Sequence, residues 1–279
     1  MKSIHIVAEK LPQAWEQAVA QCWQTGSEFR TEYDQAGEPS SRDVVAMIHV
    51  LQPFSEPRIH RAFPGGLNDL EKYRAEMLYG VHDHWVDPGL NKWEYTYHQR
   101  LCEYTLPSGE TVNQIATLVE KLRRVSFTRR AQAVTWKAWE DSEVYDPPCL
   151  QRLWFRVEGD KLNMIAHMRS NDAYKAGFMN MYAFTELQAD IARQLNLQPG
   201  EYLHVADSFH IYGSYFQEFS GFLKTLENRS AEDRYFGNDF CREFFVEGID
   251  ELLAEQDMPS AKKQILQARR EELVSVPKG

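Results

Sequence analysis

Cysteine is scarce in this sequence of 279 residues, and its four copies, Cys22, Cys102, Cys149 and Cys241, lie far apart. They form no CxxC pair and the histidines are not clustered, so neither a zinc site nor a disulfide framework is expected. Long apolar runs are also missing, since no stretch approaches the roughly 20 residues that span a membrane. The opening segment MKSIHIVAEKLPQAW lacks the apolar core and the cleavage region of a signal peptide. These absences predict a cytoplasmic protein with reduced thiols.

An excess of basic residues is absent as well. The chain has 31 Lys and Arg against 41 Asp and Glu, a net charge of −10, which argues against non-specific binding of nucleic acid. This charge leaves room for a local basic pocket that binds a small anion. Internal repeats and low-complexity segments are missing too, so we expect a single domain over residues 1–279.

Hydrophobic periodicity predicts the secondary structure. Apolar residues at helical spacing indicate helices over residues 11–26, 70–80, 112–125 and 178–196, with a helical tail over 243–270. Runs of β-branched and aromatic residues indicate strands over 44–52, 131–139 and 200–216, with a loop over 56–69. The clearest unit is 150–170, where two alternating runs flank the turn residues EGD and predict an antiparallel hairpin. The mixed order predicts an α+β fold with a mixed sheet flanked by helices.

Cys149 lies in DPPCLQ, behind two prolines and at the front of an apolar run. Two prolines fix the direction of the chain and remove two backbone donors, so the approach to the next strand is stiff. A stiff approach holds the thiol in one place. That geometry suits a nucleophile, and it equally suits a small buried side chain at the start of a strand.

Several polar groups suit the recognition of a nucleotide. Arg169 and Ser170 in RSND combine forked guanidinium donors with a hydroxyl, which suits a phosphate monoester, although a salt bridge would explain the arginine equally well. Asn180 stands among apolar residues, either as a core amide or as a reader of a pyrimidine edge. His210 and Tyr212 alternate onto one strand face, which fits a sugar clamp or an ordinary half-buried sheet face.

Taken in order, PPC at Cys149, RSND, Asn180 and HIY, preceded by the pair Arg129 and Arg130, resemble the thymidylate synthase superfamily. PPCLQ and RSND look closer to its archaeal and nucleotide-hydroxymethylase branches. Order and spacing agree over about residues 129–215, and YRAEMLYG with Glu76 and YTYHQRL with Tyr97 are weaker matches. The resemblance implies a thymidylate-synthase-like fold and an enzyme that acts on a pyrimidine nucleotide.

The resemblance also implies a role for each residue. Cys149 would add as a thiolate to C6 of the base, so that C5 attacks a methylene group carried by 5,10-methylenetetrahydrofolate or a related reduced pterin. Glu76 and Tyr97 would relay protons, and Asp172 would face the pterin. The substrate would be held by the following residues: Arg169 and Ser170 at the phosphate, Asn180 at the base, His210 and Tyr212 at the sugar, and Arg129 and Arg130 at the phosphate from a neighbouring subunit. A homodimer with shared active sites follows from the last pair.

Some positions depart from the family pattern. Leu150 stands after the nucleophile where many members carry histidine, Asp146 replaces an apolar residue, and the tail SVPKG differs from the usual closing tail. The tail of the family excludes water, and water decides between a methyl and a hydroxymethyl product. Conversion of dUMP to dTMP is the first expectation, and a 5-hydroxymethylase acting on dUMP, dCMP or CMP is the alternative.

Two other classes compete with this reading. A catalytically silent nucleotide-binding module would keep the phosphate site and lack the glutamate relay. A cysteine hydrolase would need His98, His167 or His210 to reach Cys149, and nothing in the local sequence supports that. Within the enzyme reading, a neutral amide at Asn180 favours uracil, because it accepts from N3–H and donates to O4, whereas a carboxylate suits cytosine.

Overall fold

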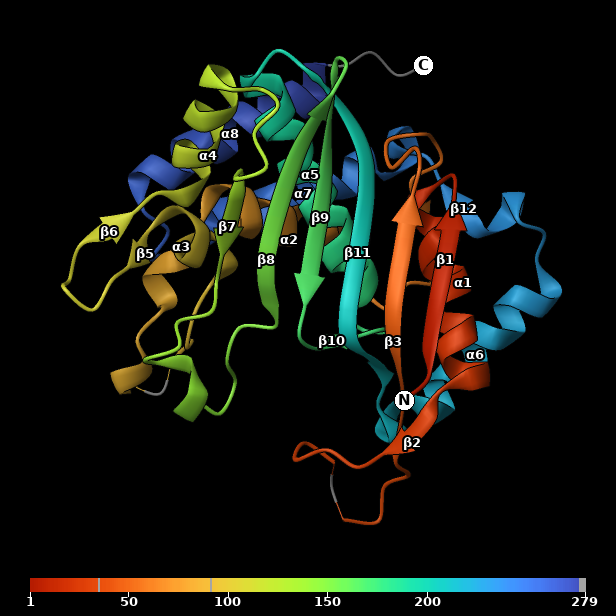
Figure 1. The fold of residues 1–279 in the computed structure, drawn as a ribbon. Helices are drawn as coiled ribbons and strands as arrows, with labels where there is room; N and C mark the ends of the chain where they lie inside the picture. The colour runs from red at the N-terminus through yellow and green to blue at the C-terminus, as the bar shows by residue number, and fades with distance from the viewer. Residues whose placement is uncertain (35, 91, 276–279) are drawn as a thin grey trace. The chain divides into compact units, whose positions relative to one another are not determined.

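The computed structural model describes residues 1–34, 36–90 and 92–275, and the chain divides into two compact units (Figure 1). The first unit comprises residues 1–65, 165–181 and 200–238, and the second comprises residues 66–164, 182–199 and 239–279. The chain passes from one unit to the other within β9 (Lys161–Met168) and within α5 (Gly177–Gln194).

The first unit is built on a mixed sheet. β1 (Ser3–Ala8) pairs in parallel with β3 (Ser41–Val50), and β11 (Gln198–Ile211) pairs with β3 in antiparallel fashion (Figure 1). The end of β9 neighbours β11, β2 (Ser27–Phe29) pairs with β3, and β10 (Asn171–Asp172) pairs in parallel with β11. The side chains of β1 alternate between exposed and buried, as expected for a strand with one face on a core.

Helices complete the first unit. α1 (Leu11–Thr25) connects β1 with β2, carries Pro12 in its first turn and buries Trp15 completely. The indole N–H of Trp15 donates to the carbonyl of Ala173 at 2.8 Å, and its ring meets Phe222 of α6 (Phe216–Asn228) edge to face at 5.3 Å. This aromatic core fixes α1 and α6.

The second unit combines the other edge of the sheet with several helices. β7 (Gln132–Val134) pairs in antiparallel fashion with β8 (Leu150–Glu158), which neighbours the start of β9. The helices are α2 (Leu67–Tyr79), α3 (Tyr97–Cys102), α4 (Gln114–Arg124), the end of α5, and two C-terminal helices, α7 (Asn238–Ala254) and α8 (Ser260–Ser275). Small elements complete the chain: strand pairs β4 (Ile59–His60) with β12 (Tyr235–Phe236) and β5 (Tyr104–Thr105) with β6 (Thr111–Val112), and short 3-10 helices at Asp83–Trp85, Pro88–Leu90, Asp141–Glu143, Gly213–Tyr215 and Glu232–Arg234.

A buried ion network joins α2 to α8. Glu71 of α2 is fully buried and accepts hydrogen bonds from Arg74 at 3.1 Å and from Arg269 of α8 at 2.9 Å. Arg74 also donates to Glu186 at 2.8 Å. Each buried charge in this network therefore has an opposite charge as its partner, which burial requires.

The predicted class is confirmed: the fold is α+β with a mixed sheet flanked by helices. The helices expected over 11–26, 70–80, 112–125 and 178–196 are α1, α2, α4 and α5, and the hairpin over 150–170 is β8 and β9. Gly80 ends α2 in the left-handed conformation, as expected of a C-terminal glycine. The expectation of one domain over residues 1–279 stays a prediction.

Other boundaries were wrong. The strand expected over 131–139 is limited to β7, and the strand expected over 200–216 ends at Ile211, where a 3-10 helix and α6 follow. The loop expected over 56–69 contains β4, and the helical tail is interrupted at residues 255–259, before Ser260. Aromatic content favours strands in a short window, but tertiary packing decides between strand and helix. In the part of the chain described here, no helix has both the length and the apolar character needed to cross a membrane.

Candidate active site

The segment that carries Cys149 is fixed at the entry of β8. Cys149 follows Pro147 and Pro148, and Leu150 behind it is fully buried as the first residue of the strand. The backbone N–H of Leu150 donates to the hydroxyl of Tyr97 at 3.2 Å. The expected strand start is therefore also a site where the backbone on both sides of the thiol is restrained.

Three tyrosines surround this segment. Tyr95 accepts a hydrogen bond from the backbone N–H of Cys149 and is hydrogen-bonded to Tyr97, and the two rings lie 5.5 Å apart. Burial raises the pKa of Tyr73, Tyr95 and Tyr97, and negative charge on Cys149 raises each pKa further. The phenols therefore keep their protons at neutral pH.

Glu76 of α2 is held by a histidine that the sequence reasoning missed. His82 contacts Glu76 through Nδ1 at 3.1 Å and Glu255 through Nε2 at 3.3 Å, and its ring stacks on Trp85 at 3.9 Å. Burial lowers the pKa of His82, but the hydrogen bonds and charges of Glu76 and Glu255 outweigh it and raise the pKa above its usual value. An imidazolium between two carboxylates fixes the orientation of Glu76. The run GVHDHW directly after the helix end was the available signal.

Arg129 and Arg130 precede β7 and are both exposed. The backbone carbonyl of Arg129 accepts a hydrogen bond from the indole N–H of Trp154 at 3.1 Å, so the main chain is anchored while the side chains extend from the unit. Phe127 next to them has 85% of its surface exposed.

Arg169 and Ser170 follow the end of β9 in the first unit, and Asp172 lies on β10. Oδ1 of Asp172 accepts the backbone N–H groups of Tyr174 at 3.0 Å and Lys175 at 2.9 Å. Burial raises the pKa of Asp172 to about 6 in spite of these bonds. Asp172 therefore shapes the turn into α5, and its carboxyl is half-buried there with a raised pKa.

Asn180 lies in the first turns of α5 with 6% of its surface exposed, and its backbone N–H donates to Ala176 at 2.9 Å. Its neighbours in the helix, Phe178 and Met181, are buried as well. The helix that the sequence predicted is therefore confirmed around this amide. Its role as a base reader stays a prediction.

His210 and Tyr212 are neighbours at the end of β11, although Tyr212 lies just beyond the strand. Their rings meet edge to face at 4.5 Å. Nδ1 of His210 lies 3.2 Å from the hydroxyl of Ser208, which donates to Asp43. Burial lowers the pKa of His210 to about 4, so the ring is neutral. Its Nε2 is buried and has no hydrogen-bond partner among the described residues, which is costly unless a ligand supplies one.

The histidines invoked for a hydrolase have other partners. His98 binds Asp83 through Nδ1 at 2.6 Å and also bonds the thiol of Cys102, and His167 contacts Asp207 at 3.0 Å. No group of three His, Cys, Asp or Glu side chains in residues 1–34, 36–90 and 92–275 is arranged to hold a metal ion.

The positions that depart from the family pattern lie partly at this site. Asp146 acts electrostatically on Tyr95, so a negative charge lies near the tyrosines that surround the Cys149 segment. Of the tail SVPKG, Ser275 ends α8, and residues 276–279 lie outside the described residues.

Comparisons with known proteins find a matching family model and several relatives. The family model described as thymidylate synthase matches residues 67–271. A protein named "Putative thymidylate synthase" from Methanocaldococcus jannaschii is 31% identical over 204 residues, which cover 71% of this chain and 86% of the relative. A second protein of that name, from Methanopyrus kandleri, is 31% identical over 72% of this chain and 88% of its own length. A "Thymidylate synthase" of Listeria monocytogenes is 25% identical over 54% of this chain and 47% of its own length.

Proposed function

Because this chain belongs to the thymidylate synthase family, we propose that it transfers a one-carbon unit from a reduced folate to C5 of a pyrimidine nucleotide, converting dUMP to dTMP. The observation that carries the proposal is the position of Cys149, at a restrained strand entry beside three protonated tyrosines. The cosubstrate supplies the methylene group and the electrons that reduce it.

Cys149 is the nucleophile of this reaction. Its thiolate adds to C6 of the base, which gives C5 the electron density to attack an electrophilic carbon. Tyr95 and Tyr97 restrain the backbone at and after the cysteine, so the sulfur is held at one place at the entry of β8. The sulfur leaves again from C6 when the product forms, so the enzyme is regenerated.

Glu76 moves protons on and off the base. His82 and Glu255 hold Glu76 in one orientation, as a relay through ordered water requires. The presence of this relay favours a working enzyme over a silent nucleotide-binding module.

The phosphate and the cosubstrate are assigned to other side chains. Arg169 and Ser170 bind the phosphate from within the chain, and Arg129 and Arg130 bind the phosphate of a neighbouring subunit in a homodimer. Asp172 fits a pterin because a carboxylate is the acceptor that adjacent N–H donors of such a ring need, and the backbone hydrogen bonds of Asp172 fix its direction.

The base and the sugar are recognised by neutral groups. The amide of Asn180 accepts from N3–H and donates to O4 of uracil. The buried Nε2 of His210 accepts from the sugar 3′-hydroxyl, and Tyr212 beside it contacts the same hydroxyl. A neutral imidazole suits this role, since only the unprotonated nitrogen accepts a hydrogen bond.

A 5-hydroxymethylase is the second candidate, and Asp146 favours it. A carboxylate near Tyr95 retains water where an apolar residue would exclude it, and water traps the methylene intermediate as a hydroxymethyl group. Mass analysis of the product formed from dUMP, dCMP and CMP with methylenetetrahydrofolate tests both candidates. A methylated product from dUMP supports the first, a hydroxymethylated product supports the second, and no product from any nucleotide contradicts both.

A further inference from the structure

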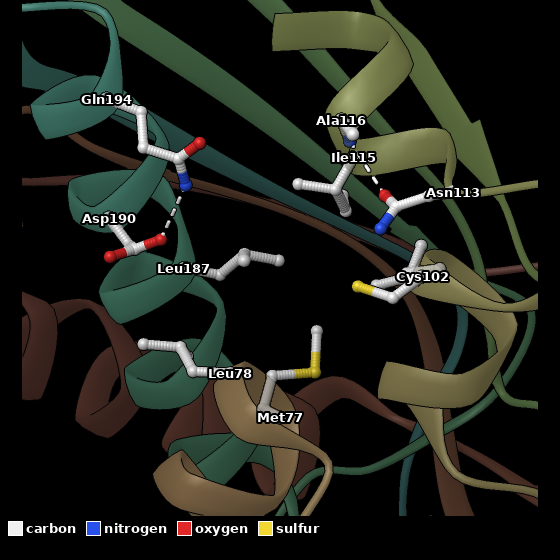
Figure 2. A pocket seen from close by; sticks show the side chains of 10 residues that line it. Met77, Leu78, Cys102, Asn113, Ile115, Ala116, Leu187, Asp190 and Gln194 are labelled. Atoms are coloured by element: carbon white, nitrogen blue, oxygen red, sulfur yellow. Dashed lines mark hydrogen bonds between the residues drawn. The ribbon is translucent and has the colours of Figure 1, made fainter. Parts of the chain in front are cut away.

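A cavity of about 210 Å³ lies within the second unit, apart from the Cys149 segment (Figure 2). Residues of α2, α3, α4 and α5 line it, together with Asn113 before α4: Met77, Leu78, Leu101, Cys102, Ile115, Ala116, Leu187, Asp190 and Gln194. Figure 2 shows the sulfur of Cys102 pointing into this space from α3 and Asp190 facing it from α5. The cavity is therefore lined by polar and apolar groups alike, with a thiol and a carboxylate in its wall.

Cys102 belongs to a hydrogen-bonded series of three side chains, Asp83, His98 and Cys102. His98 lies one helical turn before it on α3 and makes a hydrogen bond with the thiol. Nδ1 of His98 lies 2.6 Å from Oδ2 of Asp83, and Oδ1 of Asp83 accepts the hydroxyl of Thr96. A carboxylate thus orients an imidazole, and the imidazole contacts a thiol, which is the arrangement that activates a cysteine.

The neighbours of His98 determine whether its ring is charged. Burial lowers the pKa of His98, but hydrogen bonds and charges of Asp83 and Cys102 outweigh burial and raise the pKa to about 9. His98 is therefore an imidazolium at neutral pH.

The geometry depends on Gly80. A Cβ atom at this position would lie 2.1 Å from Oδ2 of Asp83 and 2.2 Å from Nδ1 of His98. The residue also has φ of +60°, which glycine adopts without strain. The end of α2 therefore has to be glycine for Asp83 and His98 to pair.

The rest of the cavity wall defines which molecule fits. The volume corresponds to about seven water molecules at ~30 Å³ each, so a molecule of similar atom count fills it. Asp190 receives hydrogen bonds from Gln194 at 2.9 Å and from Arg193 at 3.0 Å, and Arg193 is 70% exposed. An exposed arginine neutralises a carboxylate only weakly, so Asp190 favours a cationic group in the cavity.

We propose that Cys102 is a second reactive thiol of this protein, a site of thiol–disulfide exchange with small disulfides that carry a primary ammonium group. The Cys102 thiolate attacks one sulfur of the disulfide, a new S–S bond forms to Cys102, and the S–S bond of the reagent breaks. The departing thiolate takes the proton of the His98 imidazolium. The reaction uses no other oxidant, and it is independent of the proposed transfer to a nucleotide.

The test compares two small disulfides of similar length on the full chain with Cys149→Ser, so that only the other thiols react. Cystamine is the cationic probe and bis(2-hydroxyethyl) disulfide is the neutral one. Peptide mass spectrometry follows the rate at each cysteine, and a short peptide with the sequence around Cys102 is the unfolded reference. We expect Cys102 in the folded chain to react about tenfold faster than the peptide, and His98→Gln to remove that advantage.

Asp190→Asn is the matched variant for the charge preference and leaves the thiol and its histidine unchanged. The ratio of cystamine to neutral rates at Cys102 should exceed the ratio on the peptide by about two- to fivefold, and Asp190→Asn should abolish that excess. The proposal is overturned if Cys102 in the folded chain reacts no faster than the peptide. If Asp190→Asn leaves the preference for cystamine unchanged, the assignment of ammonium-bearing disulfides as the ligand class is contradicted.

Discussion

At the scale of single residues, the site depends on groups that hold the reacting side chains. Glu76 is held by His82, and the backbone at Cys149 and Leu150 is held by Tyr95 and Tyr97. Their contacts join α2, the segment after it and the start of β8. Such positioning contacts are the means by which a fold keeps a reacting group in place.

His82→Gln should lower kcat about tenfold and leave KM for the nucleotide nearly unchanged, because the relay is disturbed and substrate binding is not. The raised pKa of His82 also links stability to pH. Its contribution is complete below pH 6.5, the usual value, and is lost as pH rises through the raised pKa. Unfolding measured from pH 6 to pH 9 should therefore show a decline that is weaker in the variant.

The same change at His84 is the control for His82. His84 is exposed and lies 3.4 Å from Asp257, away from Glu76. His84→Gln should keep the kcat and the pH dependence of the parent protein. Equal effects of the two changes would contradict a positioning role for His82.

Asn180→Asp should shift preference from dUMP toward dCMP, because the carboxylate loses the donor to O4 and accepts from a 4-amino group. Leaving a buried acceptor unpaired costs about 1–3 kcal/mol, so kcat/KM for dUMP should fall roughly tenfold to a hundredfold. Kinetics with both nucleotides on both proteins measure the ratio. If Asn180 is only a core amide, both values fall equally and Tm falls with them.

At the scale of elements, periodicity predicted what is locally encoded. α1, α2 and α4 have a buried stripe, α5 is an apolar run that is buried nearly all round, and the β8–β9 hairpin has clear alternation around a short turn. β1 was missed because its six residues alternate over too short a window at the chain end. α6 was missed because the expected strand ran to Phe216, the first residue of the helix, and no element was expected directly after it.

In the candidate site, too, the sequence revealed the local features and not the contacts between distant residues. The prolines before Cys149 and the pair His210 and Tyr212 were visible because their meaning is local. The contacts of His82 with Glu255 and of His98 with Asp83 were not visible, because they join residues that are distant in sequence and are set by packing.

Glu71→Leu should destabilise the protein by about 3–5 kcal/mol, because it leaves the buried guanidinium of Arg74 without one of its carboxylate partners. Arg269 of α8 loses its buried acceptor as well. Urea unfolding followed by circular dichroism measures the change. Asp250→Asn, which breaks the exposed pair with Arg270 between α7 and α8, is the matched control and should change stability little.

At the scale of the whole molecule, the proposal requires an assembly of two chains, because Arg129 and Arg130 are exposed and are assigned to the phosphate of a neighbouring subunit. Mixing Arg129→Ala subunits with inactive Cys149→Ser subunits should restore activity, since one of the two hybrid sites then has both groups intact. Activity of the purified heterodimer, against each homodimer, measures this. Heterodimers as inactive as the parent variants would contradict shared active sites.

The central claim is that Cys149 forms a covalent bond to C6 of a pyrimidine nucleotide, and trapping that bond tests it most directly. The protein is incubated with 5-fluoro-dUMP and methylenetetrahydrofolate, because fluorine at C5 cannot leave as a proton does and the adduct accumulates. Peptide mass spectrometry should find the nucleotide and the folate on Cys149, and no adduct on Cys22, Cys102 or Cys241. Cys149→Ser should still bind the nucleotide and form no adduct. An adduct on another cysteine, or product formation by Cys149→Ser at the parent rate, would contradict the account.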